Sequence, residues 1–256
     1  MEEEAFDVAV SFCHVSKSFK GFGGQVFHAL NDVSFNVGKG EFCILAGRNG
    51  SGKSLLMSIA GGLVRPDSGN VAFPCENDSR NATGKSIGMV FQNVRESILG
   101  DTALDDVLLS LGIRDRKMRN PKEIAMSLLE DVGLKGKENR PSHALSSGEG
   151  RRLLAASVLA LGRDVIFFDE PYSNLDYPGV REMNRMIARL KDEGRTIVLI
   201  THELEKCLGL ADKLFVLDNG VLVYSGNPEG ALGSLNKWGI REPEIAAKGI
   251  KSLVWL

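Results

Sequence analysis

Short apolar runs alternate with helical patterns through most of the chain. Residues 42–46, 165–168 and 196–200 are nearly continuous apolar runs of strand length, and residues 87–91 form another that ends at Gln92. Runs of this kind are typical of strands that are buried on both faces of a parallel sheet. Because helical patterns lie between them, the order of the elements predicts an α/β fold.

A different pattern precedes this core. Residues 8–12 and 33–37 alternate or cluster as strands do, and a glycine-rich turn at 21–24 lies between them. Residues 70–73 form one more short strand after a turn at 65–69. These segments predict a mainly antiparallel sheet beside the parallel one.

Helical spacing dominates residues 102–140, where leucines and valines recur every three or four positions, and a further helix is predicted from about Gly150 to residue 161. A helical insertion between the strands of an α/β core is typical of a subdomain. Near the end of the core, an Asn-Gly pair joins strand patterns at 213–218 and 221–224, which predicts a β-hairpin.

A glycine-rich stretch at residues 47–54 follows the first buried run and reads G-x-x-x-x-G-K-S. Between a strand and a helix, such a stretch lets backbone N–H groups and the positive end of the helix point at a phosphate. Its lysine neutralises β- and γ-phosphates and its serine ligates Mg²⁺. A chance match in a surface loop is the alternative, which the flanking elements disfavour. The candidate phosphate-binding residues are Gly47, Asn49, Gly50, Ser51, Gly52, Lys53 and Ser54.

Polar side chains end the other buried runs. Gln92, the pair Asp169 and Glu170, and His202 each follow a predicted strand. In parallel sheets ligands bind at the carboxyl ends of the strands, so we expect these side chains to meet the glycine-rich stretch at one edge. Taken singly, each side chain has a non-functional explanation: the carboxylates could cap a helix, the histidine could be structural, and a single glutamine carries no information. Their coincidence at one edge favours a shared site.

Composition narrows the class of protein. The chain has 256 residues, 43% of them hydrophobic and 25% charged, which fits one large α/β domain. With 31 basic and 33 acidic residues its formal charge is −2, so we expect no nucleic acid as a partner. Four widely spaced cysteines predict neither a zinc site nor a disulfide framework. The acidic first residues are unlike a signal peptide, and the longest apolar run, at 153–161, is too short to span a bilayer.

In order, these motifs resemble those of the ATP-binding-cassette (ABC) ATPases along nearly the whole chain. Residues 145–149, Leu-Ser-Ser-Gly-Glu, are similar to the family's signature motif, and residues 173–176 are similar to its D-loop. Gln92 and His202 stand where the family has its Q-loop glutamine and switch histidine. Phe19 stands where the family places an aromatic residue that stacks on adenine, although a core position is the alternative.

The resemblance implies the fold and the cofactors. It implies a P-loop NTPase (RecA-like) parallel-sheet core with an N-terminal antiparallel β subdomain and a helical signature subdomain, and it implies ATP and Mg²⁺. One ABC ATPase domain then covers residues 1–256. Its predicted divisions are an antiparallel β part at about 1–40 and 62–86, a nucleotide-binding core at 40–61, 86–92 and 162–226, a helical part at 93–161 and a tail at 227–256.

The same resemblance implies roles for single side chains. Asp169 would hold the metal, directly or through water, with Ser54 and Gln92 as further metal-site residues. Glu170 would be the base that polarises the attacking water, while Gln92 would sense the γ-phosphate and His202 would contact it. Such roles suit phosphoryl transfer, which depends on positioning and charge stabilisation.

The family's signature motif acts across a head-to-tail dimer. Ser146 and the backbone at Gly148 would therefore contact the γ-phosphate bound by a second ABC ATPase subunit, and Asp176 would couple the two sites. Ser147 replaces the usual glycine and Glu149 the commonest glutamine. We expect hydrolysis to be retained, and to be slowed if the Ser147 side chain crowds the phosphate.

A finer resemblance is to the energy-coupling-factor importers. Residues 91–107 and 226–243 are similar to the corresponding stretches of their ATPases, although Val94 replaces a usual proline. This resemblance implies an ATPase that powers import of a vitamin or a transition-metal ion, peripheral to the cytoplasmic face of the membrane. It implies a homodimer or a heterodimer of ATPases, a transmembrane scaffold and a substrate-binding membrane subunit as partners. The alternatives are another importer class, a soluble ABC ATPase for assembly or repair, and a regulatory module without catalysis.

Overall fold

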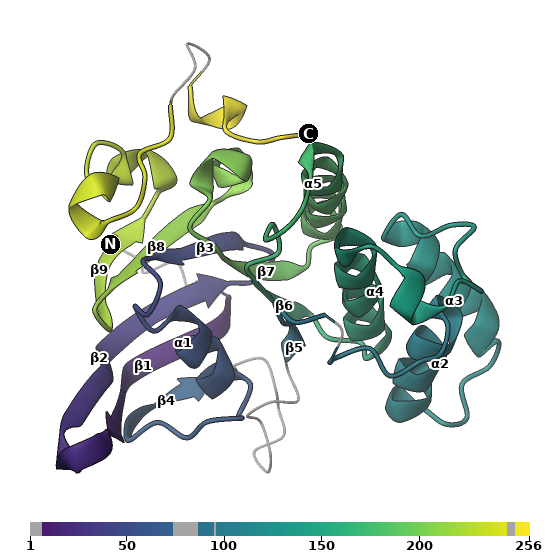
Figure 1. Cartoon of the computed structure of the whole chain (residues 1–256), viewed down its shortest axis with the longest axis horizontal. Helices are drawn as coiled ribbons and strands as arrows, with labels where there is room; N and C mark the ends of the chain where they lie inside the picture. Colours follow the sequence, from purple (N-terminus) through teal and green to yellow (C-terminus); the bar gives the residue numbers. More distant parts are fainter. Residues whose placement is uncertain (1–6, 74–86, 95, 245–248) are drawn as a thin grey trace.

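The computed structural model describes residues 7–73, 87–94, 96–244 and 249–256 (Figure 1). The end of the predicted antiparallel part, residues 74–86, lies outside the described residues. Within the described ranges the chain forms a six-stranded sheet, a three-stranded sheet and five α-helices. Figure 1 shows the three-stranded sheet and the helices α2, α3 and α4 on opposite sides of the larger sheet.

The larger sheet has the strand order β5-β6-β7-β3-β8-β9. Its first five strands run parallel, and β9 runs antiparallel to β8 at one edge, as the Asn-Gly pair predicts. The bounds are β3 Phe42–Gly47, β5 Ile87–Val90, β6 Val165–Asp169, β7 Thr196–Ile200, β8 Lys213–Asp218 and β9 Val221–Gly226. The predicted P-loop α/β fold, with its antiparallel and helical parts, is confirmed.

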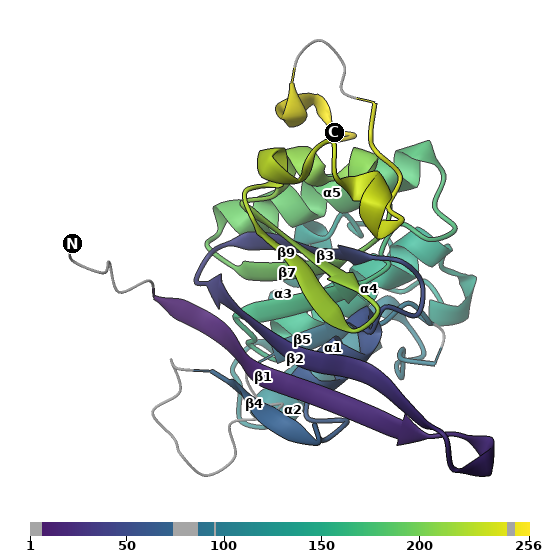
Figure 2. The same ribbon diagram turned by 90° about the vertical axis from the view of Figure 1, so that its left-hand side faces the viewer.

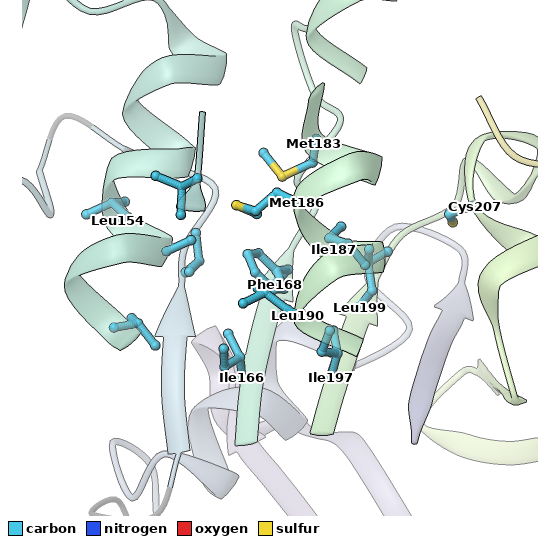
Figure 3. Close-up of a cluster of buried hydrophobic side chains, with 14 of the residues drawn as sticks. Leu154, Ile166, Phe168, Met183, Met186, Ile187, Leu190, Ile197, Leu199 and Cys207 are labelled. Atoms are coloured by element: carbon cyan, nitrogen blue, oxygen red, sulfur yellow. The ribbon is translucent and has the colours of Figure 1, made fainter. Parts of the chain in front are cut away.

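Alternation along the buried strands divides the interior into two apolar clusters. In β6, Ile166 and Phe168 face one cluster while Val165 and Phe167 face the other. Helix α5 (Tyr177–Asp192) covers the first cluster, and Figure 3 shows its Met186 among the side chains of β6 and β7. Helix α1 (Lys53–Ala60) and the three-stranded sheet cover the second. Both faces are therefore buried, which is why the strands read as continuous apolar runs.

The three-stranded sheet has the order β2-β1-β4, with β1 Val8–Lys20, β2 Val26–Gly38 and β4 Ser68–Ala72. A short 3₁₀ helix, η1 (Phe22–Gly24), joins β1 to β2. Figure 2 shows this hairpin projecting beyond the rest of the molecule. The strand predictions at 8–12 and 33–37 cover only the buried halves, because the residues near the tip are exposed and lack apolar alternation.

Three helices form the predicted helical part. They are α2 (Ala103–Arg114), α3 (Pro121–Asp131) and α4 (Ser147–Ala160). The helix expected from about Gly150 begins three residues earlier, because Ser146 caps it and Glu149 completes a capping box. The remaining 3₁₀ helices are η2 Ser142–Ala144, η3 Leu204–Lys206, η4 Leu208–Leu210, η5 Pro228–Ala231, η6 Leu235–Trp238 and η7 Ile250–Ser252.

One buried carboxylate ties the segment after β5 to the helices. Asp106 of α2 is 5% exposed. Its Oδ1 accepts from the backbone N–H groups of Leu99 and Gly100, at 2.8 and 2.9 Å, and its Oδ2 accepts from the Ser157 hydroxyl of α4 at 2.5 Å. A Cβ at position 100 would lie 2.2 Å from the Asp106 nitrogen, so this segment needs its glycine.

We expect Asp106→Ala to lower the free energy of unfolding by about 3 kcal/mol, because it leaves buried donors without an acceptor. Asp105→Ala is the matched control, since that exposed carboxylate serves only the capping box of α2 and its loss costs about 1 kcal/mol. Urea unfolding measures both. Equal losses for the two variants would contradict the structural role of Asp106.

Candidate functional site

The polar strand ends converge as the sequence predicts. Four consecutive strands, β5, β6, β7 and β3, end at or just before Gln92, Asp169 with Glu170, His202 and the glycine-rich loop respectively. A hollow of about 460 Å³ opens there, which we call the phosphate hollow. Its lining includes Asn49, Gly50, Gly52, Lys53, Ser54, Gln92, Glu170, Ser173 and His202, with Ala29 of β2 on its rim.

Close approach of backbone segments requires glycines in the loop. Gly47 ends β3 with φ 154°, and a Cβ there would lie 2.3 Å from the Leu217 carbonyl oxygen. Gly52 has φ 104°, and a Cβ there would lie 2.9 Å from the Ala29 carbonyl oxygen. The loop therefore turns tightly between β3 and α1 and leaves its N–H groups and the start of the helix facing the hollow.

The Lys53 ammonium lies folded back into this loop. Lys53 is 5% exposed, and its Nζ donates to the carbonyl oxygens of Gly47 and Arg48 at 2.8 and 2.9 Å. Burial lowers the pKa of the Lys53 ammonium, and the carboxylates of Glu170 and Asp169 partly offset that effect. The site therefore holds a positive charge that a phosphate group would stabilise.

Asp169 and Ser51 carry buried oxygens that have no partner among the described residues. These are Asp169 Oδ1 and Ser51 Oγ, in side chains 9% and 3% exposed. Burial raises the pKa of the Asp169 carboxyl, while a hydrogen bond from Ser54 and the charge of Lys53 act against it. Unpaired buried oxygens are costly unless a ligand satisfies them. Together with the exposed Ser54 hydroxyl they form an oxygen donor set suited to Mg²⁺.

Glu170 and His202 meet directly. His202 Nδ1 lies 2.9 Å from Glu170 Oε1, and the Thr201 hydroxyl donates to Glu170 Oε2 at 3.3 Å. Glu170 has φ 45°, a left-handed conformation that costs a residue with a side chain, and its N–H donates to the Ile200 carbonyl oxygen at 2.9 Å. The hydrogen bond to β7 holds Glu170 in this strained conformation and so fixes its carboxylate at the edge of the phosphate hollow.

Sequence reasoning did not select three residues that support this edge, namely Ser173, Arg151 and Thr201. Gln92 Nε2 lies 3.5 Å from the Ser173 hydroxyl, and the buried Arg151 guanidinium donates to the Ser173 carbonyl oxygen at 2.5 Å. Thr201 was missed although the strand-end argument that selected His202 applies equally to the residue before it. Arg151 had no such signal, because its contact lies 22 residues away in the sequence.

Ser146 and its neighbours line a second hollow, of about 920 Å³, and not the phosphate hollow. Gln92 lines both. Ser146 Oγ accepts from the Glu149 N–H at 3.2 Å, and the Ser146 N–H donates to Glu149 Oε2 at 2.8 Å. Ser147 is exposed and outside the left-handed region, so position 147 does not need glycine geometry. Crowding of a bound phosphate by its side chain stays a prediction.

Gly148, Asp176 and Phe19 lie outside the phosphate hollow. Gly148 is buried, and a Cβ there would lie 3.2 Å from Leu175. Asp176 caps α5 by accepting from the Gly179 N–H at 2.9 Å. Phe19 is 45% exposed, so it is not a core residue, and it pairs across the hairpin with Phe27, two residues before Ala29 of the hollow's rim. Its contact with adenine stays a prediction.

Comparison with known proteins places this geometry among nucleotide-binding cassettes. Residues 30–173 match the ABC transporter family. The chain is similar to the energy-coupling factor transporter ATP-binding protein EcfA1 of Fusobacterium nucleatum, with 36% identity over 81% of this chain and 80% of the relative. It is also similar to EcfA of Methanocaldococcus jannaschii, with 33% identity over 85% of this chain and 81% of the relative.

Solved structures agree with these relatives. CbiO1 from Clostridium perfringens, part of the ABC transporter complex cbiONQ, superimposes with a TM-score of 0.76 at 28% identity, over 88% of this chain and 90% of the other. A dimeric ATP-binding cassette with bound ADP and phosphate superimposes with a TM-score of 0.75 at 26% identity, over 86% and 98%. Among the described residues of this chain, no helix is long and apolar enough to cross a membrane.

The raised pKa of Asp169 gives a test in the protein without ligand. A carboxyl whose pKa is higher in the folded than in the unfolded protein binds its proton more tightly when folded. Its contribution to stability therefore falls as the pH rises from the unfolded to the folded pKa. We therefore expect Asp169→Asn to raise the unfolding midpoint at pH 7 by about 2–4 °C, as roughly 1 kcal/mol does in a chain of this size. The difference should vanish at about pH 3.

Asp164→Asn is the matched control for this prediction. Asp164 precedes the same strand but is 89% exposed and pairs with Arg195, so its loss should leave the midpoint nearly unchanged. Calorimetry at pH 7 and at about pH 3 measures all three proteins. A lower midpoint for Asp169→Asn at pH 7 would contradict the interpretation.

Proposed function

The chain is an ATPase of the ABC transporter family, similar to energy-coupling-factor ATP-binding proteins, and on that premise we propose that it powers import of a vitamin or a transition-metal ion. The observation that carries the proposal is the Glu170 carboxylate, held 2.9 Å from His202 at the edge of the phosphate hollow. A carboxylate beside a buried ammonium and a phosphate-binding loop suits activation of a water against a γ-phosphate.

Each side chain of the hollow has a role in this reaction. Lys53 and the loop N–H groups bind the phosphates and stabilise the charge that spreads over them in the transition state. Glu170 accepts the proton of the attacking water, and His202 orients that carboxylate and contacts the γ-phosphate. Gln92 lines both hollows, which suits a residue that senses whether nucleotide is present.

Mg²⁺ fits the oxygen donors at and next to the phosphate hollow. Ser54, Asp169 and Gln92 would hold it, directly or through water, and the unpartnered Asp169 Oδ1 supports this assignment. When bound, the ion neutralises charge on the phosphates. Phe19 provides an aromatic surface for the adenine ring beyond the rim of the hollow.

A second ATPase subunit completes the site. Ser146 and Gly148 lie away from the phosphate hollow of their own chain, so head-to-tail pairing is required to bring them to a phosphate. The dimeric cassette among the structural neighbours supports such pairing. ATP binding then closes the dimer, with Asp176 at the junction of the two sites, and the identity of the partner subunit decides whether the pair is symmetric.

An exposed apolar surface suits a membrane partner. Leu99, Leu109 and Ile113 are 78%, 50% and 73% exposed, and they line one open hollow of about 750 Å³ beside α2. We call these three residues the docking face. Exposed aliphatic side chains gathered in one hollow are typical of a protein interface. The proposed occupant is a cytoplasmic loop of the transmembrane scaffold, which would place this chain on the cytoplasmic face with a substrate-binding membrane subunit nearby.

Hydrolysis by the assembled transporter tests the catalytic assignment. We expect Glu170→Gln to bind ATP but to lose at least 100-fold in turnover, because the general base is gone while the binding groups remain. Glu193→Gln is the control, since Glu193 is exposed and pairs with Arg189 at the far end of α5. Phosphate release measures turnover, and a fluorescent ATP analogue measures binding. Full turnover of Glu170→Gln would refute the role of Glu170.

Co-purification tests the docking face. We expect Ile113→Asp to remove the membrane subunits from the detergent-solubilised complex, because a charge there cannot enter an apolar contact. Leu63→Asp is the control: Leu63 is a 63% exposed aliphatic residue outside the docking face. Mass identification of the retained polypeptides gives the result. Retention of a multi-helix subunit by Ile113→Asp would place the contact elsewhere.

A further inference from the structure

We propose that Lys137 and Arg140 are positioning residues for hydrolysis, because they neutralise Glu149 and so allow the start of α4 to receive the phosphate of a second subunit. The proposal rests on the proposed function, since it concerns the phosphate that Ser146 would meet in a dimer. It adds two cations that lie outside every sequence motif to the residues that the reaction needs.

Two cations contact the mostly buried Glu149 carboxylate, one of them at short range. Lys137 Nζ donates to Glu149 Oε1 at 2.6 Å, and an Arg140 guanidinium nitrogen lies 3.5 Å from Glu149 Oε2. The Glu149 side chain is 12% exposed, whereas those of Lys137 and Arg140 are 36% and 44% exposed. Arg152 of α4 also lies in the field of Glu149 but is shared with Glu182. The carboxylate of Glu149 is therefore paired with two cations and lies near a third.

These contacts balance the negative charge of Glu149. Burial alone raises the pKa of the Glu149 carboxyl, but hydrogen bonds from Lys137 and from the Ser146 N–H, with the charges of Lys137 and Arg140, bring that pKa below its usual value. Without the two cations, a negative charge would stand in the first turn of α4, beside the group proposed to bind phosphate. Two like charges a few ångströms apart repel strongly where water is partly excluded.

The fold holds the two cations in place. The Lys137 N–H donates to the Leu134 carbonyl oxygen at 3.0 Å, and the Arg140 N–H donates to the Lys137 carbonyl oxygen at 3.0 Å. The Ala103 N–H of α2 donates to the Arg140 carbonyl oxygen at 3.3 Å. Because backbone bonds to α2 fix this loop, the pairing with Glu149 is part of the folded structure and not a chance surface contact.

The Glu149→Gln variant tests the charge of Glu149 separately from its role in the capping box of α4. A glutamine can still complete the capping box with Ser146 but needs no cation to neutralise it. We therefore expect Lys137→Met to lower the turnover of the assembled ATPase about fivefold, a loss in line with one uncompensated charge at partly solvated range. Lys137→Met combined with Glu149→Gln should restore turnover to within about twofold of Glu149→Gln alone.

Lys135→Met is the matched control. Lys135 lies in the same loop and pairs with Glu130 at 2.6 Å, so its loss removes the same charge from the surface without exposing Glu149. Its turnover should stay at the wild-type value. Binding of a fluorescent ATP analogue to the dilute single chain should be equal in all variants, because the proposed effect acts on the phosphate of the other subunit.

Three results would overturn the proposal. One is wild-type turnover in Lys137→Met, another is a loss that Lys135→Met shares, and the last is a loss that Glu149→Gln does not rescue, which would mean that Lys137 only supports the loop. Failure of the proposed function looks different, because then the assembled wild-type protein would show no turnover that Glu170→Gln abolishes.

Discussion

A buried ammonium group is the constraint on which the rest of the site depends. Lys53 donates two hydrogen bonds to carbonyl oxygens of its own loop, which holds the loop folded back on itself. A glycine at position 47 lets the loop pass this close to β8, and the two hydrogen bonds of Lys53, together with the carboxylates at the end of β6, offset the cost of burying the charge. The resulting cation faces a hollow among N–H groups, where an anion completes what the protein leaves unsatisfied.

Much of this could be predicted from sequence because it is local. The strand, loop and helix around Lys53 are contiguous in the sequence. The buried strands are recognisable as apolar runs, and because the strands are parallel, their last residues lie at the same edge of the sheet. The start of α4 could not be predicted as well, because Gly148 and Gly150 argue against a helix. Packing overrides that preference: a Cβ at Gly150 would lie 2.6 Å from Val94. The capping box of Ser146 and Glu149 was the available signal for the true start.

What the sequence could not predict are contacts between distant segments. Arg151 and Ser173, or Lys137 and Glu149, come together only because α2, α4 and the strand β6 pack in one arrangement. No periodicity marks such pairs, since each charged side chain taken alone reads as an ordinary surface charge and a backbone carbonyl has no signal in the sequence. The long hairpin of β1 and β2 was underestimated for a related reason, because strand pairing continues past the last buried residue.

Close packing around α4 makes this part of the molecule rigid. Leu153, Leu154 and Val158 join the same apolar cluster as β6, β7 and α5, and a Cβ at Gly88 of β5 would lie 1.9 Å from Val158. Interiors packed this tightly have low compressibility and pass strain on. Because α2 packs against α4, a displacement of α2 would therefore also shift the end of α4 that carries Ser146, with little loss to deformation.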